Sequence, residues 1–436
     1  MTEKHQIIIV GGGAGGLELA TKLGHSMGKK GLADIILIDK SRTHIWKPLL
    51  HEVAAGTLDS SEDELEYLAQ ARWHHFRFRL GKMTGLDRDT QEVVVAPTYN
   101  ADGEMIIPER RFRYDTLVMS VGSLSNDFGI KGVKEHCLFL DSTEQAERFQ
   151  QKMLDAMIRA HAGHKAIEKG QLDVAIVGAG ATGVELAAQL HHVARQLSAY
   201  GLDTIDPSEH IKLHIIEAGP RILPALPERI SNSALKVLSK LEVTVHVNER
   251  VIEITDEGIH TSSGQVIPAR FKVWAAGIKA PDFMQELAGL ETNHINQLVV
   301  HTNLQTTRDE RIFAMGDCAA CPMGDSGSNV PPRAQAAHQM ASLVYKNIKR
   351  KLKNRTLVNY HYKDYGSLIA MGRYSTVGNL MGNLTGPFFI SGFIARFVYL
   401  SLYKMHQAAL YGWPRAILIA FLHFLRKGID PQVKLH

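Results

Sequence analysis

The sequence predicts an α/β fold that combines two parallel-sheet domains of one kind, the second inserted into the first, with an amphipathic helical region at the C-terminus. The glycine pattern GxGxxG occurs twice, at residues 11–16 and 178–183, each time directly after a short apolar run. A further apolar run that ends in an acid follows each glycine loop. The segment from Gly392 onward combines apolar residues with a local excess of Lys and Arg.

The two glycine loops have the pattern of a phosphate-binding strand-to-helix turn. The first glycine of such a loop allows the tight turn, the second lets the backbone approach a pyrophosphate, and the third lets the helix pack on the strand. The N-terminus of the helix then faces the anion. We therefore predict two Rossmann-like dinucleotide-binding domains. The loop glycines are Gly11, Gly13 and Gly16 in the first and Gly178, Gly180 and Gly183 in the second.

Asp39 and Glu217 end the apolar runs that follow the two loops, where a carboxylate can accept hydrogen bonds from a ribose diol. A carboxylate at Glu217 would repel the extra phosphate of NADP, so NADH is favoured in the second domain. Arg221 is near enough in sequence to soften this repulsion, and Gly178 precedes Glu217 by more than the usual spacing of about 20 residues. The alternative is a solvated acid at the end of a strand.

Further strands repeat the pattern and set the predicted boundaries. Residues 116–122 and 271–277 each form an apolar strand that runs into a glycine turn. Residues 311–317 form a short strand ending in Gly-Asp, which suits a carboxylate, Asp317, placed against the sugar-like chain of a ligand. We predict a first domain from 1–125 and 296–390, a second domain from 126–295, and C-terminal membrane-surface helices from 391–436.

Composition excludes several classes of protein. A net charge of +4 over 436 residues, without a long basic run, gives no support for nucleic-acid binding. Three cysteines, Cys137, Cys318 and Cys321, cannot form the disulfide framework of a secreted protein, so a reducing cytosolic setting is expected. Cys318 and Cys321 form a CxxC pair without the second pair that a zinc site needs, so no metal is predicted. The pair is either redox-active or two reduced structural thiols.

The C-terminal segment predicts amphipathic helices that lie on a membrane surface without crossing it. No run reaches the roughly 18 apolar residues that a spanning helix needs. Apolar residues recur at helical spacing from Ile394 to Ala409 and again from Ile417 to Leu425, with basic residues between and after them. Trp413, between the two segments, suits the depth of lipid headgroups. The alternative is a helical hairpin packed on its own protein or on a second copy in a homodimer.

The paired loops, the two strand-to-glycine returns and residues 312–319 resemble the flavoprotein superfamily with two dinucleotide-binding domains. Within it, residues 46–50, 183–187 and 334–339 and the amphipathic tail are similar to the bacterial type II NADH:quinone oxidoreductases. The resemblance implies non-covalent FAD in the first domain and NADH as substrate in the second. By position, FAD would be held by Gly11, Gly13, Gly16, Asp39 and Asp317, and NADH by Gly178, Gly180, Gly183 and Glu217.

The same resemblance implies a peripheral enzyme on the cytoplasmic face of the bacterial cell membrane. It would oxidise NADH and reduce ubiquinone or menaquinone without pumping protons, and so feed the respiratory chain. Gln335 and Gln339 lie four residues apart, on one face of a helix that we expect to begin at the preceding prolines. Their amides could bind a quinone carbonyl, or they could only order the flavin. Glu185 is a candidate for NADH positioning or proton handling, or a simple complement to its helix N-terminus. Arg373 could stabilise a developing quinol anion or be a surface charge.

Two other functions stay open. Disulfide reductases of the superfamily carry a cysteine pair near the first helix, and residues 41–56 contain no cysteine. A thiol-dependent reductase would therefore have to use Cys318 and Cys321. An NADH-sensing flavoprotein, in which turnover is incidental to signalling, is the second alternative.

Overall fold

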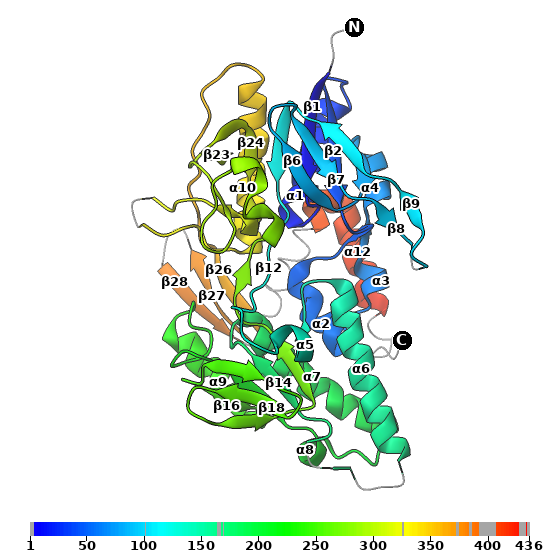
Figure 1. Cartoon of the computed structure of the whole chain (residues 1–436). Helices are drawn as coiled ribbons and strands as arrows, with labels where there is room; N and C mark the ends of the chain where they lie inside the picture. The colour runs from blue at the N-terminus through cyan, green and yellow to red at the C-terminus, as the bar shows by residue number, and fades with distance from the viewer. Residues whose placement is uncertain are drawn as a thin grey trace. The chain divides into compact units, whose positions relative to one another are not determined.

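The computed structural model describes residues 4–100, 102–163, 167–168, 170–324, 327–371, 375–382, 386–391, 407–426 and 433. The chain divides into two compact units. Unit 1 consists of Met1–Trp46, Glu64–Leu124 and Ile278–Asp364, and unit 2 consists of Lys47–Asp63, Ser125–Gly277 and Tyr365–His436. Each unit contains its own parallel sheet and helices, so the predicted α/β class is confirmed (Figure 1).

The boundaries of the units differ from those expected from the sequence. Residues 47–63 lie in unit 2, because α2 (Leu50–Ala55) packs against α6 (Thr143–Ala162) and α7 (Ala181–Ala199). Unit 1 resumes at Ile278, ahead of the expected residue 296. The residues from Tyr365 onward also belong to unit 2.

Unit 1 is built on a sheet of six strands in the order β23-β24-β11-β1-β2-β5. The bounds are β1 His5–Val10, β2 Ala33–Asp39, β5 Arg77–Leu80, β11 Thr116–Met119, β23 Gln305–Thr306 and β24 Asp309–Ala314. β1 lies between β2 and β11 and pairs with both in parallel, with Val10 opposite Ile38 and Met119. The side chains of Ile7, Ile8 and Ile9 are fully buried, as expected for a strand covered on both faces.

Helices α1 (Ala14–Leu23) and α10 (Ala334–Lys351) of unit 1 pack closely on each other. A Cβ at Gly15 would come 3.1 Å from the carbonyl oxygen of Ala337, so the small residue permits this approach. The first glycine loop and the helix that carries Gln335 and Gln339 are therefore parts of one packed layer.

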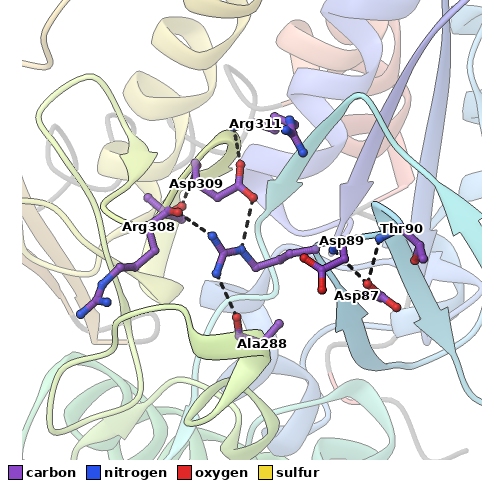
Figure 2. Close-up of polar contacts among 9 residues, drawn as sticks. Asp87, Asp89, Thr90, Ala288, Arg308, Asp309 and Arg311 are labelled. Carbon is purple, nitrogen blue, oxygen red and sulfur yellow. Dashed lines mark hydrogen bonds and ion pairs between the residues drawn. The ribbon is translucent and has the colours of Figure 1, made fainter.

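A second sheet of unit 1 is antiparallel and consists of β6 (Met83–Asp87), β7 (Glu92–Val95) and β10 (Arg110–Arg113). Arg88, in the turn between β6 and β7, fixes this sheet to the rest of the unit. Its guanidinium donates to the Asp309 carboxylate at 3.2 Å, to the carbonyl of Ala288 at 3.2 Å and to the carbonyl of Arg308 at 2.6 Å (Figure 2).

Unit 2 repeats the architecture of unit 1. Its parallel sheet has the order β13-β20-β14-β15-β16, with bounds Leu138–Phe139, Phe271–Trp274, Val174–Val177, Leu213–Ile216 and Thr244–His246. β14 lies between β15 and β20 as β1 lies between β2 and β11, and Val177 stands opposite Ile216 and Trp274. The internal repeat expected from the two strand-to-glycine returns is thus confirmed. Helix α9 (Glu228–Lys240) also packs against α7.

Two antiparallel sheets complete unit 2. One consists of β17 (Val251–Ile254), β18 (Gly258–Thr261) and β19 (Val266–Pro268), and the other of β26 (Gly366–Met371), β27 (Ser375–Gly382) and β28 (Gly386–Ser391).

The shorter elements of the chain are η1 Gly24–Gly28, β3 Thr43–His44, η2 Lys47–Leu49, α3 Ser60–Asp63, β4 Leu65–Glu66, α4 Tyr67–His74, β8 Thr98–Tyr99, β9 Met105–Ile107, β12 Leu124–Ser125, α5 Val133–His136, α8 Pro207–His210, β21 Ile278–Lys279, η3 Asp282–Met284, η4 Leu287–Gly289, β22 Leu298–Val299, η5 Gly316–Cys318 and β25 Ala319–Ala320.

The C-terminal region contributes helix α12 (Trp413–Arg426). Within the described ranges, no helix combines the length and the apolar character needed to span a bilayer. α12 exposes a run of large apolar side chains that recur at helical spacing: Trp413, Ile417, Leu418, Phe421, Leu422 and Leu425. The predicted helical positions from Ile394 to Met405 lie outside the described residues.

Candidate functional site

The first glycine loop connects β1 to α1 and leaves no room for side chains at its outer glycines. Gly11 has a φ of +98°, and a Cβ there would come 2.3 Å from the carbonyl oxygen of Ser120. A Cβ on Gly16 would come 1.9 Å from the carbonyl oxygen of Gly11. At Gly13, the N-cap of α1, a Cβ would meet no described atom within 4 Å. The outer glycines fix the turn, and the middle one leaves open space at the helix N-terminus.

Asp39 ends β2 with its carboxylate turned onto this loop. Oδ2 accepts a hydrogen bond from the N–H of Gly12 at 2.6 Å, and Oδ1 accepts one from the N–H of Ser41 at 2.8 Å. The Tyr67 hydroxyl donates to the carbonyl of Gly12 at 2.8 Å. Burial raises the pKa of Asp39, and the backbone donors oppose this shift. Asp39 thus stabilises the loop itself, and its expected contact with a ribose would be an additional role.

Asp317 lies in η5, directly after β24, on the same sheet as the first glycine loop. Its Oδ2 accepts a hydrogen bond from Oγ of Ser123 at 2.8 Å, and its carbonyl accepts one from Nε2 of Gln297 at 2.8 Å. Gly316 has a φ of +70°, which a glycine adopts without strain. The turn therefore holds the Asp317 carboxylate in a fixed position at the carboxyl end of β24.

Helix α10 begins at Ala334, so the expectation that a proline occupies its first turn is wrong. Arg333 is the N-cap, with an extended backbone at φ −144° and ψ 149°. Pro331 and Pro332 precede it, and a proline restricts the residue before it to extended conformations. Pro332 restricts Pro331 in this way, and because Arg333 is also extended, the first helical residue is Ala334.

Gln335 and Gln339 lie one turn apart on α10, and both amides bind the segment that ends unit 1. Nε2 of Gln335 donates to the carboxylate of Asp364 at 3.2 Å. Gln339 donates to the carbonyl of Lys363 at 2.8 Å and accepts from its N–H at 3.0 Å. Arg333 also pairs with Asp364, at 3.1 Å. Both glutamines remain partly exposed.

The second glycine loop, between β14 and α7, repeats the geometry of the first. Gly178 has a φ of +104°, and a Cβ there would come 2.8 Å from the backbone of Ala275. A Cβ on Gly183 would come 2.0 Å from the carbonyl oxygen of Gly178. A Cβ on Gly180, the N-cap of α7, would meet no atom within 4 Å in the described part of the chain. The same open space therefore lies at the N-terminus of this helix.

Glu217 follows β15 and contacts the second loop as Asp39 contacts the first. Its Oε2 accepts from the N–H of Ala179 at 3.0 Å, and its Oε1 accepts from the N–H of Gly219 at 2.8 Å. The Arg221 guanidinium instead donates to the carbonyls of Leu223 and Leu226, at 3.2 and 2.9 Å. Arg221 is held by its own turn and makes no hydrogen bond to Glu217 among the described contacts.

Glu185 is buried in the first turns of α7, with 6% of its surface exposed. Oε1 accepts a hydrogen bond from the N–H of Ala370 in β26 at 2.9 Å, and Oε2 lies 3.7 Å from Nδ1 of His51 in α2. Burial raises the pKa of Glu185 to about 8, and the negative charge of Glu52 adds to the shift, whereas the Ala370 N–H opposes it. Glu185 is therefore a neutral carboxylic acid near pH 7 that can donate a proton.

A second buried glutamate, Glu18 in α1, was not recognised from the sequence. Its carboxylate accepts a hydrogen bond from Lys22 at 2.6 Å and is also bonded to Nδ1 of His338 in α10. Burial alone would raise the pKa of Glu18, but His338 and Lys22 outweigh this effect and lower the pKa. Glu18 follows Gly11 at the same interval at which Glu185 follows Gly178, and this shared offset was the available signal.

The cysteines are all free and buried. Burial raises the pKa of Cys318 to about 11, and it raises the pKa of Cys321 and of Cys137 to about 12. A thiolate is the reactive form of cysteine, so none of these thiols is activated at neutral pH.

The structure groups the predicted residues within each unit. Unit 1 carries Gly11, Gly13, Gly16, Asp39, Asp317, Gln335 and Gln339, and unit 2 carries Gly178, Gly180, Gly183, Glu185 and Glu217. Arg373 lies outside the described residues.

Comparison with known proteins identifies the family. The pyridine nucleotide-disulphide oxidoreductase family matches residues 5–341. A type II NADH:quinone oxidoreductase of Haemophilus influenzae is 43% identical over 99% of both chains. A type II NADH:quinone oxidoreductase of Staphylococcus aureus is 27% identical, over 87% of this chain and 90% of the relative's chain.

Solved structures share the fold. The structure of NDH2 from Plasmodium falciparum in complex with NADH superimposes with a TM-score of 0.83 at 19% identity, covering 99% of this chain and 100% of the other. The sulfide:quinone oxidoreductase of Aquifex aeolicus gives a TM-score of 0.72 at 17% identity, covering 94% and 92%. The chain belongs to the pyridine nucleotide-disulphide oxidoreductase family and, within it, to the type II NADH:quinone oxidoreductases.

Proposed function

We propose that this protein oxidises NADH and reduces a membrane quinone to quinol, with non-covalently bound FAD as its cofactor and without pumping protons. The observation that carries the proposal is the pair of glycine loops. In both loops the space beside the middle glycine, at a helix N-terminus, is open to a pyrophosphate. The residues present therefore fit two dinucleotides.

In unit 1, Gly11, Gly13 and Gly16 would hold the FAD pyrophosphate, Asp39 the ribose diol and Asp317 the ribityl chain. A bound flavin supplies the redox chemistry, because it accepts a hydride from a nicotinamide and passes on two electrons. The chain's own contribution is orientation. The hydrogen bonds of Asp39 to Gly12 and of Asp317 to Ser123 preset both carboxylates.

In unit 2, Gly178, Gly180, Gly183 and Glu217 would hold NADH. The Glu217 carboxylate discriminates against a 2′-phosphate through like-charge repulsion. The geometry of Arg221 supports this preference, because its guanidinium donates to carbonyls of its own turn.

In unit 1, the amides of Gln335 and Gln339 would bind the quinone, ubiquinone or menaquinone. In unit 2, Glu185 would serve as a proton donor. The partial exposure of both glutamines and the raised pKa of Glu185 support these roles. To bind a quinone carbonyl, Gln335 would exchange its hydrogen bond with Asp364 for one with the substrate.

The exposed apolar face of α12 supports peripheral attachment to a membrane surface, which we propose to be the cytoplasmic face of the cell membrane. Replacing Leu418, which is 56% exposed, by Ser should weaken sedimentation with anionic liposomes. Ile252→Ser is the matched control, because Ile252 is 55% exposed on β17. Unchanged sedimentation of Leu418→Ser, together with its conversion from dimer to monomer, would favour α12 as a homodimer interface.

Anaerobic stopped-flow absorbance at the visible flavin band tests the proposed reaction. NADH should bleach the band much faster than NADPH, and a short-chain quinone should then restore it. Cys318→Ser and Cys321→Ser should keep both steps, because neither thiol is activated. Loss of activity in these variants would establish the thiol reductase instead. Fast bleaching with negligible recovery by quinone would indicate the NADH sensor.

A further inference from the structure

The reaction proposed above requires one proton from solvent in each turnover. NADH gives up a hydride, which is two electrons and one proton, whereas a quinone needs two electrons and two protons to become quinol. Glu185 is buried, so a path to solvent is needed to reprotonate it after each donation.

Such a path is visible in unit 2. His51, in α2, lies between two carboxyl groups. Its Nδ1 is 3.7 Å from Oε2 of Glu185, and its Nε2 is 3.9 Å from Oε1 of Glu52. The exposed fractions of the side chains are 22% for Glu52, 1% for His51 and 8% for Glu185. The imidazole therefore lies between the buried Glu185 and the partly exposed Glu52.

The imidazole is suited to this place. Burial lowers the pKa of His51 to about 4, and a hydrogen bond to the Pro48 carbonyl opposes the shift only in part. The ring is therefore neutral, with one nitrogen that accepts a proton and one that donates. Nε2 is buried and has no hydrogen-bond partner within the described residues. Such an atom in a native structure calls for an explanation, and a functional role is one.

Among the described residues, the other contacts of Glu185 offer no competing route. α7 packs against α2, β26, β15, α8, α9 and β14. Of these, β26 supplies the Ala370 N–H, and the charge that acts on the Glu185 carboxyl is that of Glu52. Within the described part of the chain, His51 is the basic side chain at ion-pair distance from Glu185.

We propose that Glu52 and His51 relay protons from solvent to Glu185. After Glu185 has donated its proton, Glu52 takes a proton from water and passes it to Nε2 of His51, which then gives its Nδ1 proton to the Glu185 carboxylate. Glu52 is then a carboxylate again. His51 regains its Nδ1 proton when the ring turns toward Glu52, where it takes up a proton at Nδ1 and releases the one at Nε2. Each gap has to shorten by roughly 1 Å to reach hydrogen-bond distance, which a change of side-chain torsion provides.

Hydrogen–deuterium exchange at the Glu185 carboxyl group tests the relay in the purified holoenzyme. The carbonyl infrared band of the protonated acid, identified by its loss in Glu185→Gln, shifts when deuterium replaces hydrogen. After rapid mixing with D₂O, Glu52→Gln and His51→Gln should slow this shift by about tenfold or more, because neither replacement passes on a proton at neutral pH. Glu135→Gln, an exposed acid on α5, is the control and should exchange as the wild type does.

The double variant sharpens the test. Steps in series are not additive, so Glu52→Gln with His51→Gln should exchange no more slowly than the slower single variant. If His51→Gln does not fold, Glu52→Gln still tests the path, because this side chain is partly exposed. Wild-type exchange rates in the Glu52 variant, or absence of a protonated Glu185 band at pH 7, would overturn the relay. The exchange needs neither NADH nor quinone, so its failure is distinct from failure of the proposed function.

Discussion

Glu18 of unit 1 and Glu185 of unit 2 occupy the same position relative to their glycine loops. The carboxyl group of Glu18 is ionised near pH 7, whereas that of Glu185 is neutral. Each is buried in the first turns of the helix that follows the loop. Glu18 is bonded to Lys22 and His338, which lower its pKa. Glu185 faces the neutral ring of His51 and one backbone N–H, and its pKa is raised to about 8.

This difference in charge shows that the position of the carboxyl group and its charge state have separate structural causes. The repeated loop and helix determine where the carboxyl group lies and how deeply it is buried. The neighbours, which come from other elements, determine whether it carries a charge. A duplicated scaffold can thus place one structural anion and one proton donor at equivalent positions.

Substitution of the third glycine in each loop should cause the largest loss of stability, because both loops pack this glycine against the carbonyl of the first glycine. Gly16→Ala and Gly183→Ala would place a Cβ 1.9 and 2.0 Å from a carbonyl oxygen. Each should lower the free energy of unfolding by about 3 kcal/mol. Urea unfolding followed by circular dichroism measures the loss.

The middle glycines provide the control. Gly13→Ala and Gly180→Ala meet no described atom within 4 Å, so the unfolding free energy should fall by less than about 1 kcal/mol. Dinucleotide affinity of the corresponding unit should fall sharply, as measured by flavin content or NADH titration. Equal loss of stability at middle and third glycines would mean that the open spaces are not binding space.

Replacing each glutamate by glutamine should have the next largest effect and should distinguish the charged Glu18 from the neutral Glu185. Glu18→Gln leaves Lys22 and His338 without their anion and should cost about 2 kcal/mol at pH 7. Glu185→Gln removes the cost of protonating this acid on folding at pH 7 and should raise the free energy of unfolding by up to about 3 kcal/mol. Unfolding of both variants under identical conditions gives the comparison, and similar losses would contradict the assigned charge states.

The pH dependence of stability should have opposite signs at the two positions. The folded protein holds the Glu185 proton more tightly than the unfolded chain, so stability should fall by up to about 1.4 kcal/mol per pH unit as pH rises between the unfolded value of 4.5 and about 8. Glu185→Gln should lose this slope. The contribution of Glu18, whose pKa is lowered, is present above its unfolded pKa and disappears as pH falls through the folded pKa. Parallel pH profiles for the two variants would refute the distinction.

A small effect is expected at Tyr67, whose hydrogen bond to the first loop has no counterpart among the described contacts of the second loop. Tyr67→Phe removes the hydrogen bond to the Gly12 carbonyl and should cost about 1 kcal/mol. Flavin retention on dilution should decrease, while NADH affinity should stay at the wild-type value. A loss of NADH affinity instead would show that the effect is not confined to the first loop.

Structural features that depend on residues close together in the sequence could be predicted. Contacts between residues far apart in the sequence could not. The glycine loops, their following acids and the internal repeat follow from local spacing and apolar runs, and the structure contains them. The bond between Glu18 and His338 joins residues 320 positions apart, and the approach of His51 to Glu185 depends on how α2 packs on α7. Neither contact leaves a mark in sequence spacing, and for the same reason the assignment of residues 47–63 to unit 2 was not foreseen.

Because the native thiols are buried, they should react little with labelling reagents, so a cysteine introduced on the surface can be labelled selectively. Maleimide reagents react with thiolates, and Cys137, Cys318 and Cys321 are buried with pKa values of about 11 to 12. A cysteine introduced by Ile417→Cys, at a position that is 63% exposed on α12, would carry a fluorophore while the three native residues stay in place. An environment-sensitive dye at that position would report directly, in real time, when the helix meets lipid.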